Sequence, residues 1–176
     1  MPLKEKHQSP ATMILGPEGE ALLKEIEQLR LKPYDDQTGK NISQWIGGAT
    51  IGYGHFIKEE SEWDYYKEGI TKEEADTLFM EDSQKYIDRV NESLDVKVSQ
   101  QQFDALVILC YNIGKAGLAT SSVIKLINNL DAKTPYTSLE KAWKAWDKSQ
   151  GKVNEGLVNR RNAEWTIYSK GIYTRW

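Results

Sequence analysis

A carboxylate within an apolar stripe is the first residue of chemical interest in this sequence. At about 100° per residue, a helix through residues 75–90 places Ala75, Phe79, Asp82 and Tyr86 on one face. A buried carboxylate without a partner is costly, so Asp82 requires a cation. His55, at the end of a glycine-rich segment, is a candidate partner. We interpret His55 and Asp82 as a structural pair, with a catalytic role for Asp82 as the alternative.

Glu27 is the second candidate for chemistry. In a helix predicted over residues 18–31 it lies at the border of the apolar face, one turn after Leu23. Neighbouring apolar groups partly exclude water from a carboxyl there, which favours the protonated form that a general acid needs. Glutamates at helix borders are common, so this position alone does not separate an acid from a solvated side chain.

The composition narrows the class of protein. The chain has 176 residues, of which 39% are hydrophobic and 28% charged, which fits one domain and excludes a disordered tail or a disulfide scaffold. No apolar run approaches the roughly 20 residues of a membrane-spanning helix, and the polar opening residues do not resemble a signal peptide. We therefore expect synthesis in the cytoplasm without a signal peptide, and no stable membrane insertion. With one cysteine, Cys110, and two histidines, we expect no metal centre built from cysteine or histidine side chains.

Helical patterns dominate the elements that must position these residues. Besides residues 18–31, helices are predicted after capping boxes at Thr71–Glu74 and Ser99–Gln102, and over residues 121–130, 138–149 and 157–170. Residues 103–113 are apolar almost all round, which predicts a buried central helix. Residues 34–57 are rich in turn residues, and residues 50–55 predict a hairpin strand. The fold class is therefore a mostly helical α+β domain over residues 18–176, with β structure only near the N-terminus and a loosely packed extension over residues 1–17.

Charge is spread unevenly along the chain. Residues 133–176 carry nine Lys and Arg against four Asp and Glu, whereas residues 1–132 carry 14 against 22. A basic segment of this kind suits a polyanion, either nucleic acid or a wall polymer, or is simply a solvated helical surface. Its cations alternate with acids and form no nucleic-acid-binding motif, so we expect no nucleic-acid partner.

Several motifs, read together and in order, resemble those of the phage-type lysozymes. The first runs from Glu27 to Asp36, and the second is the Thr-Ile-Gly-Tyr-Gly-His segment at residues 50–55. Further matches occur at residues 70–82, 102–114 and 156–164, so the resemblance covers roughly residues 18–172. It implies a two-lobed lysozyme-like fold, with a small N-terminal β-hairpin lobe and a larger helical lobe.

The resemblance also implies roles for individual residues. Glu27 would be the general acid, while Asp36 and Thr50 would hold the attacking water on the opposite face of the sugar. Fourteen positions separate Asp36 from Thr50, against six in typical members, and the extra segment at residues 39–48 lengthens the hairpin. Asp35 stands beside Asp36, and we choose Asp36 by spacing.

The reaction that the resemblance implies is hydrolysis of the β-1,4 bond between N-acetylmuramic acid and N-acetylglucosamine in bacterial peptidoglycan, with no metal or organic cofactor. We expect the protein to be a monomer. Asn112, Arg160 and Arg161 are further candidates for substrate binding, and one of the two arginines is expected to reach Glu27. Trp45 in the extra segment either stacks on a sugar or fills a small hairpin core. The alternatives are a lytic transglycosylase, which needs no water-holding Asp and Thr, and a non-catalytic module that binds the wall.

Overall fold

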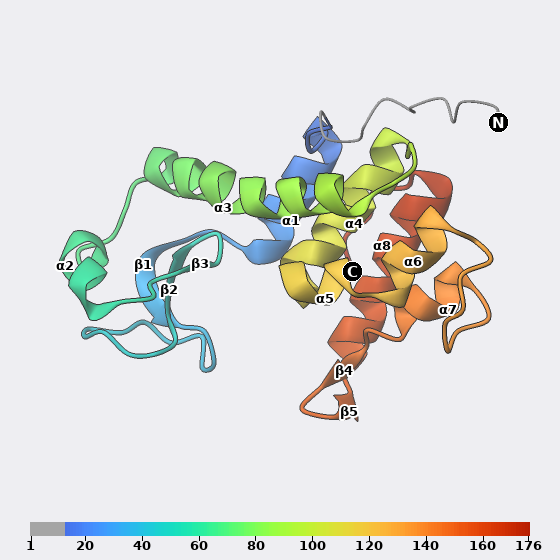
Figure 1. The fold of residues 1–176 in the computed structure, drawn as a ribbon. Helices are drawn as coiled ribbons and strands as arrows, with labels where there is room; N and C mark the ends of the chain where they lie inside the picture. Colours follow the sequence, from blue (N-terminus) through green and yellow to red (C-terminus); the bar gives the residue numbers. More distant parts are fainter. Residues whose placement is uncertain (1–12) are drawn as a thin grey trace. The chain divides into compact units, whose positions relative to one another are not determined.

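The computed structural model describes residues 13–176, and its fold is the mostly helical α+β class that the sequence predicts (Figure 1). The first twelve residues of the expected N-terminal extension lie outside the described part. The chain divides into two compact units. One unit is Leu23–Gln84, and the other combines the residues before Leu23 with Lys85–Trp176.

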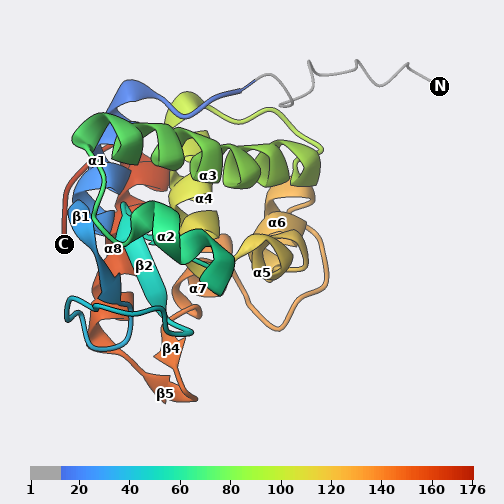
Figure 2. The same ribbon diagram turned by 90° about the vertical axis from the view of Figure 1, so that its left-hand side faces the viewer.

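The unit Leu23–Gln84, which we call the sheet-bearing unit, is built around a three-stranded antiparallel sheet in the order β1-β2-β3 (Figure 1). Strands β1 and β2 of this sheet are also labelled in Figure 2. Tyr34 pairs with Thr50 across β1 and β2, and Ile51 pairs with His55 across β2 and β3, which confirms the predicted hairpin. The elements that reach into this unit are α1 (Pro17–Glu27), β1 (Arg30–Asp35), β2 (Ala49–Gly52), β3 (His55–Phe56), the 3-10 turn η2 (Glu60–Glu62), α2 (Trp63–Tyr66) and α3 (Lys72–Ser93).

Helix α1 ends at Glu27, four residues before the end that the sequence predicts. Gln28 has a φ of 52°, and this left-handed conformation stops the helix. Strand β1 then begins at Arg30, which pairs with Gly52. The prediction of helix as far as Leu31 was therefore wrong, because pairing with β2 takes up the residues that follow Gln28.

The apolar face of α3 also differs from the prediction. Ala75, Phe79 and Val90 are buried as expected, but the buried position between them is taken by Ser83. The side chain of Asp82 lies at the edge of this face and is 20% exposed. Asp82 is thus a border residue of the stripe, so its carboxylate retains contact with water.

The second unit, which we call the helical unit, consists of helices packed around α4 (Gln100–Ile113). Residues Phe103–Cys110 of α4 are buried. This confirms the predicted central helix, and α8 packs against it. The capping box at Ser99 and Gln102 begins α4 as predicted. The other elements are α5 (Lys115–Ala119), α6 (Ser122–Asn128), α7 (Leu139–Lys144), the strands β4 (Lys148–Ser149) and β5 (Lys152–Val153), and α8 (Glu155–Lys170).

The C-terminal half contains a β-hairpin that the sequence analysis missed. Helix α7 ends at Lys144, and β4 and β5 pair around Gln150 and Gly151, both with positive φ. The predictions of a helix over residues 138–149 and of β structure only near the N-terminus were wrong. Two-residue strands are too short to produce an alternating pattern that sequence analysis can recognise.

The described residues before α1 are held by hydrogen bonds to the helical unit. The amide of Gly16 donates to Asp104 Oδ1 at 2.9 Å, and Asn91 Nδ2 donates to the carbonyl of Met13 at 3.0 Å. Leu15 is buried. The entry into α1 is therefore fixed before the helix begins.

Candidate active site

Glu27 is placed by the last turn of α1. Leu23, one turn earlier, is fully buried, and Lys24 Nζ lies 3.3 Å from Asp76 Oδ1 on α3. Burial works to raise the pKa of Asp76, but the ammonium groups of Lys72 and Lys24 outweigh it and lower that pKa. These contacts anchor the turn that carries Glu27, whose own side chain is half-buried.

The carboxylate of Glu27 lies beside the turn between β2 and β3. A Cβ atom built on Gly54 would stand 3.3 Å from Glu27 Oε2, so the glycine lets the carboxylate approach the backbone. Gly54 also has a φ of 79°, a conformation that disfavours other residues. The glycine-rich segment thus shapes the surroundings of this carboxylate.

Asp35 and Asp36, which the sequence could not separate by residue type, have different surroundings. The carboxylate of Asp35 accepts hydrogen bonds from the amide of Gln37 and the hydroxyl of Thr38, both at 3.0 Å. Asp35 therefore stabilises the turn after β1. Asp36 is exposed, and its backbone amide donates to the carbonyl of Gly48 at 3.0 Å. The side chain of Asp36 is the one turned to solvent.

Thr50 lies on the neighbouring strand and is only 4% exposed. Its hydroxyl donates to the carbonyl of Gly48 at 3.1 Å, the same oxygen that receives the amide of Asp36. With its proton committed to this carbonyl, the Thr50 oxygen can still accept a hydrogen bond from a neighbouring water or hydroxyl. One backbone carbonyl therefore ties the two residues together across the 39–48 insertion.

Tyr34 is a neighbour of this site that sequence reasoning did not single out. It pairs with Thr50 across the strands, and the guanidinium of Arg30 lies 4.3 Å from its ring centre. Burial and the charge of Asp36 raise the pKa of its hydroxyl, Arg30 opposes them, and Glu27 adds a smaller increase. The charges of Asp36 and Glu27 therefore both act on the pKa of Tyr34. Its place two residues before Asp36 on a strand was the available signal.

His55 and Asp82 face each other in the structure. His55 Nδ1 lies 2.8 Å from Asp82 Oδ2, and His55 Nε2 lies 3.5 Å from the hydroxyl of Tyr66. The two side chains are about one-fifth exposed, so this pair is partly shielded from water. The contact joins β3 to α3 and α2 within the sheet-bearing unit.

Trp45 anchors the inserted loop to the sheet. Its indole N–H donates to the carbonyl of Ile57 at 3.1 Å, and its ring is half-buried. This hydrogen bond fixes the insertion over residues 39–48 at one edge.

The two arginines expected near the site form a buried network in the helical unit. Glu164 is fully buried and accepts hydrogen bonds from Arg160 at 3.0 Å and from Arg161 at 2.7 and 2.8 Å. Arg161 also donates to the side chain of Asn112, and Trp143 donates to Glu164 at 3.1 Å. Burial lowers the pKa of Arg161, and the negative charge of Glu164 opposes this. Glu164 was not predicted as a site residue, although it lies four and three positions after the arginines.

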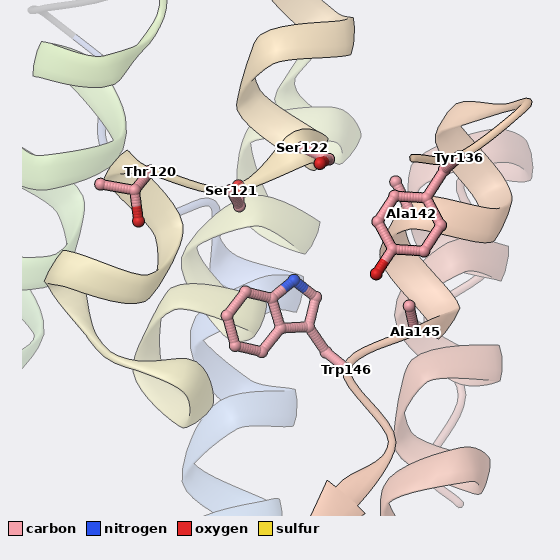
Figure 3. A pocket seen from close by; sticks show the side chains of 7 residues that line it. All are labelled: Thr120, Ser121, Ser122, Tyr136, Ala142, Ala145 and Trp146. Atoms are coloured by element: carbon pink, nitrogen blue, oxygen red, sulfur yellow. The ribbon is translucent and has the colours of Figure 1, made fainter. Parts of the chain in front are cut away.

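A pocket of about 350 Å³ opens in the helical unit (Figure 3). In the view of Figure 3, the indole of Trp146 stands between the hydroxyl-bearing residues at the α5–α6 junction and the side of Tyr136 and α7. The lining carries hydroxyls and aromatic rings but no charged side chain. The lining residues are Thr120, Ser121, Ser122, Tyr136, Ala142, Ala145 and Trp146.

Two further properties concern only residues 13–176. No group of three or more His, Cys, Asp or Glu side chains in this part is arranged to hold a metal ion. No helix in the same part is long and apolar enough to cross a membrane.

The comparison with protein families decides the relationship. The family model described as "Phage lysozyme" matches residues 24–164, which span Glu27, the sheet and most of α8. The chain belongs to the phage lysozyme family. The resemblance inferred from the sequence motifs is thereby confirmed.

Individual relatives of this phage lysozyme family member are endolysins and a muramidase domain. The chain is 36% identical to an endolysin of Bacillus phage PZA over 90% of its own length, although it spans only 56% of that endolysin. The solved endolysin from Escherichia coli O157:H7 phage FAHEc1 has a TM-score of 0.72 and 30% identity, covering 93% of this chain and 98% of that one. The muramidase domain of SpmX from Asticaccaulis excentricus has a TM-score of 0.68 and 28% identity, covering 89% and 98%.

Proposed function

We propose that this protein hydrolyses the β-1,4 bond between N-acetylmuramic acid and N-acetylglucosamine in bacterial peptidoglycan. Membership of the phage lysozyme family supports the reaction class, as do the names endolysin and muramidase among its relatives. The observation that carries the proposal is the sheet-bearing unit itself. There a half-buried Glu27 lies against Gly54, while Asp36 and Thr50 share the carbonyl of Gly48.

In the proposed mechanism, Glu27 donates a proton to the departing glycosidic oxygen. Its half-buried position at the end of α1 restrains the carboxyl and partly excludes water, which suits a proton donor. Asp36 and Thr50 orient a water molecule for attack on the sugar carbon as positive charge develops there. Asp36 accepts a proton from this water, and the Thr50 oxygen accepts its second hydrogen bond.

The pocket beside Trp146 has no charged side chain in its lining, so it suits a neutral group of a ligand. Peptidoglycan offers N-acetyl groups and peptide amides, which pair with hydroxyls and lie flat on aromatic rings. We propose that this pocket holds such a part of the polymer. Arg161 and Asn112 meet in the network around Glu164, which supports the same helices. That Arg160 or Arg161 reaches Glu27 stays a prediction.

The test is product analysis on purified peptidoglycan with Glu27→Gln. The amide keeps the shape of the side chain but cannot donate the proton, so activity should fall on the order of 10²–10⁴-fold. Glu25→Gln, an exposed change in the same helix, is the matched control and should keep parental activity. Equal activity of the two variants would remove Glu27 from the mechanism.

Mass spectrometry of the same products separates the two enzymatic alternatives. Hydrolysis leaves a reducing muramic acid, whereas a lytic transglycosylase leaves the 1,6-anhydro form. A protein that binds the wall and releases neither product would be the non-catalytic module.

A further inference from the structure

A second pocket, of about 290 Å³, lies between α2 and the first half of α3 and belongs to no part of the proposed active site. Its floor is apolar, with Tyr66 and Ile70 both buried. Tyr65, which is 69% exposed, stands edge-on to Tyr66 with ring centres 4.8 Å apart. Glu74, Thr77, Leu78 and Glu81 complete the lining from α3. We call this feature the α2–α3 groove.

The two carboxylates of the α2–α3 groove differ in how they are held. Glu74 belongs to the capping box, because its carboxylate accepts the amide of Thr71 at 2.8 Å. Glu81 follows two turns later, about 10 Å along the helix axis, and is exposed. Within residues 13–176, no lysine or arginine forms an ion pair with either glutamate. Both carboxylates can therefore receive a cation from outside the chain.

The wider charge of this unit has the same sign. Residues 23–84 contain seven Lys and Arg against fourteen Asp and Glu, a net charge of −7. Such a unit attracts cations to its surface. An exposed tyrosine ring beside carboxylates adds a cation–π surface. An apolar floor with an anionic and aromatic rim fits an alkyl chain that ends in an ammonium group.

We propose that the α2–α3 groove binds the primary ammonium of the diamino acid in a peptidoglycan stem peptide. The alkyl stem would lie on Tyr66, Ile70 and Leu78, and the ammonium would meet Glu81 and the face of Tyr65. This inference rests on the proposed wall substrate. It assigns the groove a role in holding the polymer, separate from bond cleavage at Glu27.

Binding to intact sacculi tests the proposal in a Glu27→Gln background, where the wall is not digested. Acetic anhydride blocks the free amines of one half of the sacculi, and the other half is mock-treated. Acetylation should weaken binding about three- to thirtyfold, the range for one exposed charge pair together with a cation–π contact. Adding Glu81→Gln should weaken binding to untreated sacculi by up to about fivefold, the range for one exposed charge pair. In that variant acetylation should have only the smaller effect that the remaining contact with Tyr65 supplies.

Glu73→Gln is the matched control, because it removes the same charge from an exposed position of α3 outside the groove lining. It should bind like its parent and keep the acetylation effect. If Glu73→Gln and Glu81→Gln lose binding equally, or if acetylation affects Glu81→Gln as it affects the parent, the groove assignment is wrong. Release of reducing ends by the unsubstituted protein tests the proposed function separately, so the two failures are distinguishable.

A small probe locates the contact. Titration with Nα-acetyl-lysine methylamide should shift the amide resonances of Thr77 and Leu78, and the Nε-acetylated probe should not. Equal shifts with both probes would overturn recognition of the ammonium. Shifts with lysine but no effect of wall acetylation would overturn the wall ligand and point to a lysine-bearing protein instead.

Discussion

The carboxylate of Glu27 and the backbone of Gly54 lie so close that a side chain on the glycine would stand 3.3 Å from Oε2. The two residues come from different elements, the last turn of α1 and the turn between β2 and β3. Their proximity brings together a glutamate and a glycine-rich segment that are 27 positions apart in the sequence. It also makes Gly54 a means of testing the position of the carboxylate without changing its chemistry.

Gly54→Ala should lower both stability and lytic activity. A φ of 79° strains alanine, which costs about 1 kcal/mol, and the new methyl displaces the carboxylate. Gly47→Ala is the control, because nothing lies within 4 Å of its Cβ position and its φ is not positive. Urea unfolding and turbidity assays on permeabilised cells measure the two effects. Parental activity of Gly54→Ala would show that the position of Glu27 tolerates movement.

Asp36→Asn should abolish most activity and leave the fold intact, because its exposed carboxylate is proposed to accept a proton from water. Asp35→Asn should keep most activity and lose about 1 kcal/mol of stability, since its carboxylate holds the turn at Gln37 and Thr38. Initial rates on peptidoglycan and thermal unfolding of both variants check this. The reverse order of activities would assign the water-holding role to Asp35.

Glu164→Gln should be strongly destabilising. The carboxylate is fully buried and compensates two guanidinium groups, so its loss leaves an uncompensated charge, at a cost of about 3–5 kcal/mol. Glu140→Gln breaks the exposed pair with Lys144 and should cost at most about 0.5 kcal/mol. Urea denaturation at neutral pH measures both. A loss below 1 kcal/mol for Glu164→Gln would mean that water reaches the arginines.

The sequence predicted a structural feature correctly where that feature depends on residues within one helical turn. The capping boxes at Thr71 and Ser99 form as predicted, because each is closed by residues three positions apart. The end of α1 was misplaced because it depends on the pairing of Arg30 with Gly52, a contact between distant residues. Periodicity likewise placed Asp82 in the stripe, whereas the packed helix buries Ser83.

In the candidate site, too, the residues of local motifs were predicted and the contacts between distant residues were not. Glu27, Asp36 and Thr50 were chosen from motifs, and all three lie in the sheet-bearing unit. The carbonyl of Gly48 that links Asp36 to Thr50 was not predictable, because the 39–48 insertion separates them in sequence. The partnership of Glu164 with both arginines depends on burial, which motif spacing does not report.

Tyr173 makes the stability of the fold depend on pH in alkaline solution. Its hydroxyl donates to Asp104 Oδ2 at 2.6 Å, and burial together with this hydrogen bond raises the pKa of Tyr173 well above its usual value of 10.0. A raised pKa means that the folded state holds the proton more tightly than the unfolded state. The contribution to stability is complete below about pH 10 and disappears as the pH rises through the folded value.

Tyr173→Phe should therefore lose about 1–3 kcal/mol at neutral pH, because a hydrogen bond to a buried carboxylate is removed. Above pH 10 the parent should lose stability faster than the variant, by at most about 1.4 kcal/mol per pH unit and less in practice, since Tyr173 is partly exposed to solvent. Tyr136 has no hydrogen bond to Asp104, so the stability of Tyr136→Phe should change with pH as that of the parent does. Urea unfolding from pH 7 to 11 measures the three curves. If the free energies of unfolding of the parent and of Tyr173→Phe fall equally up to pH 11, the hydrogen bond to Asp104 does not cause the loss of stability at alkaline pH.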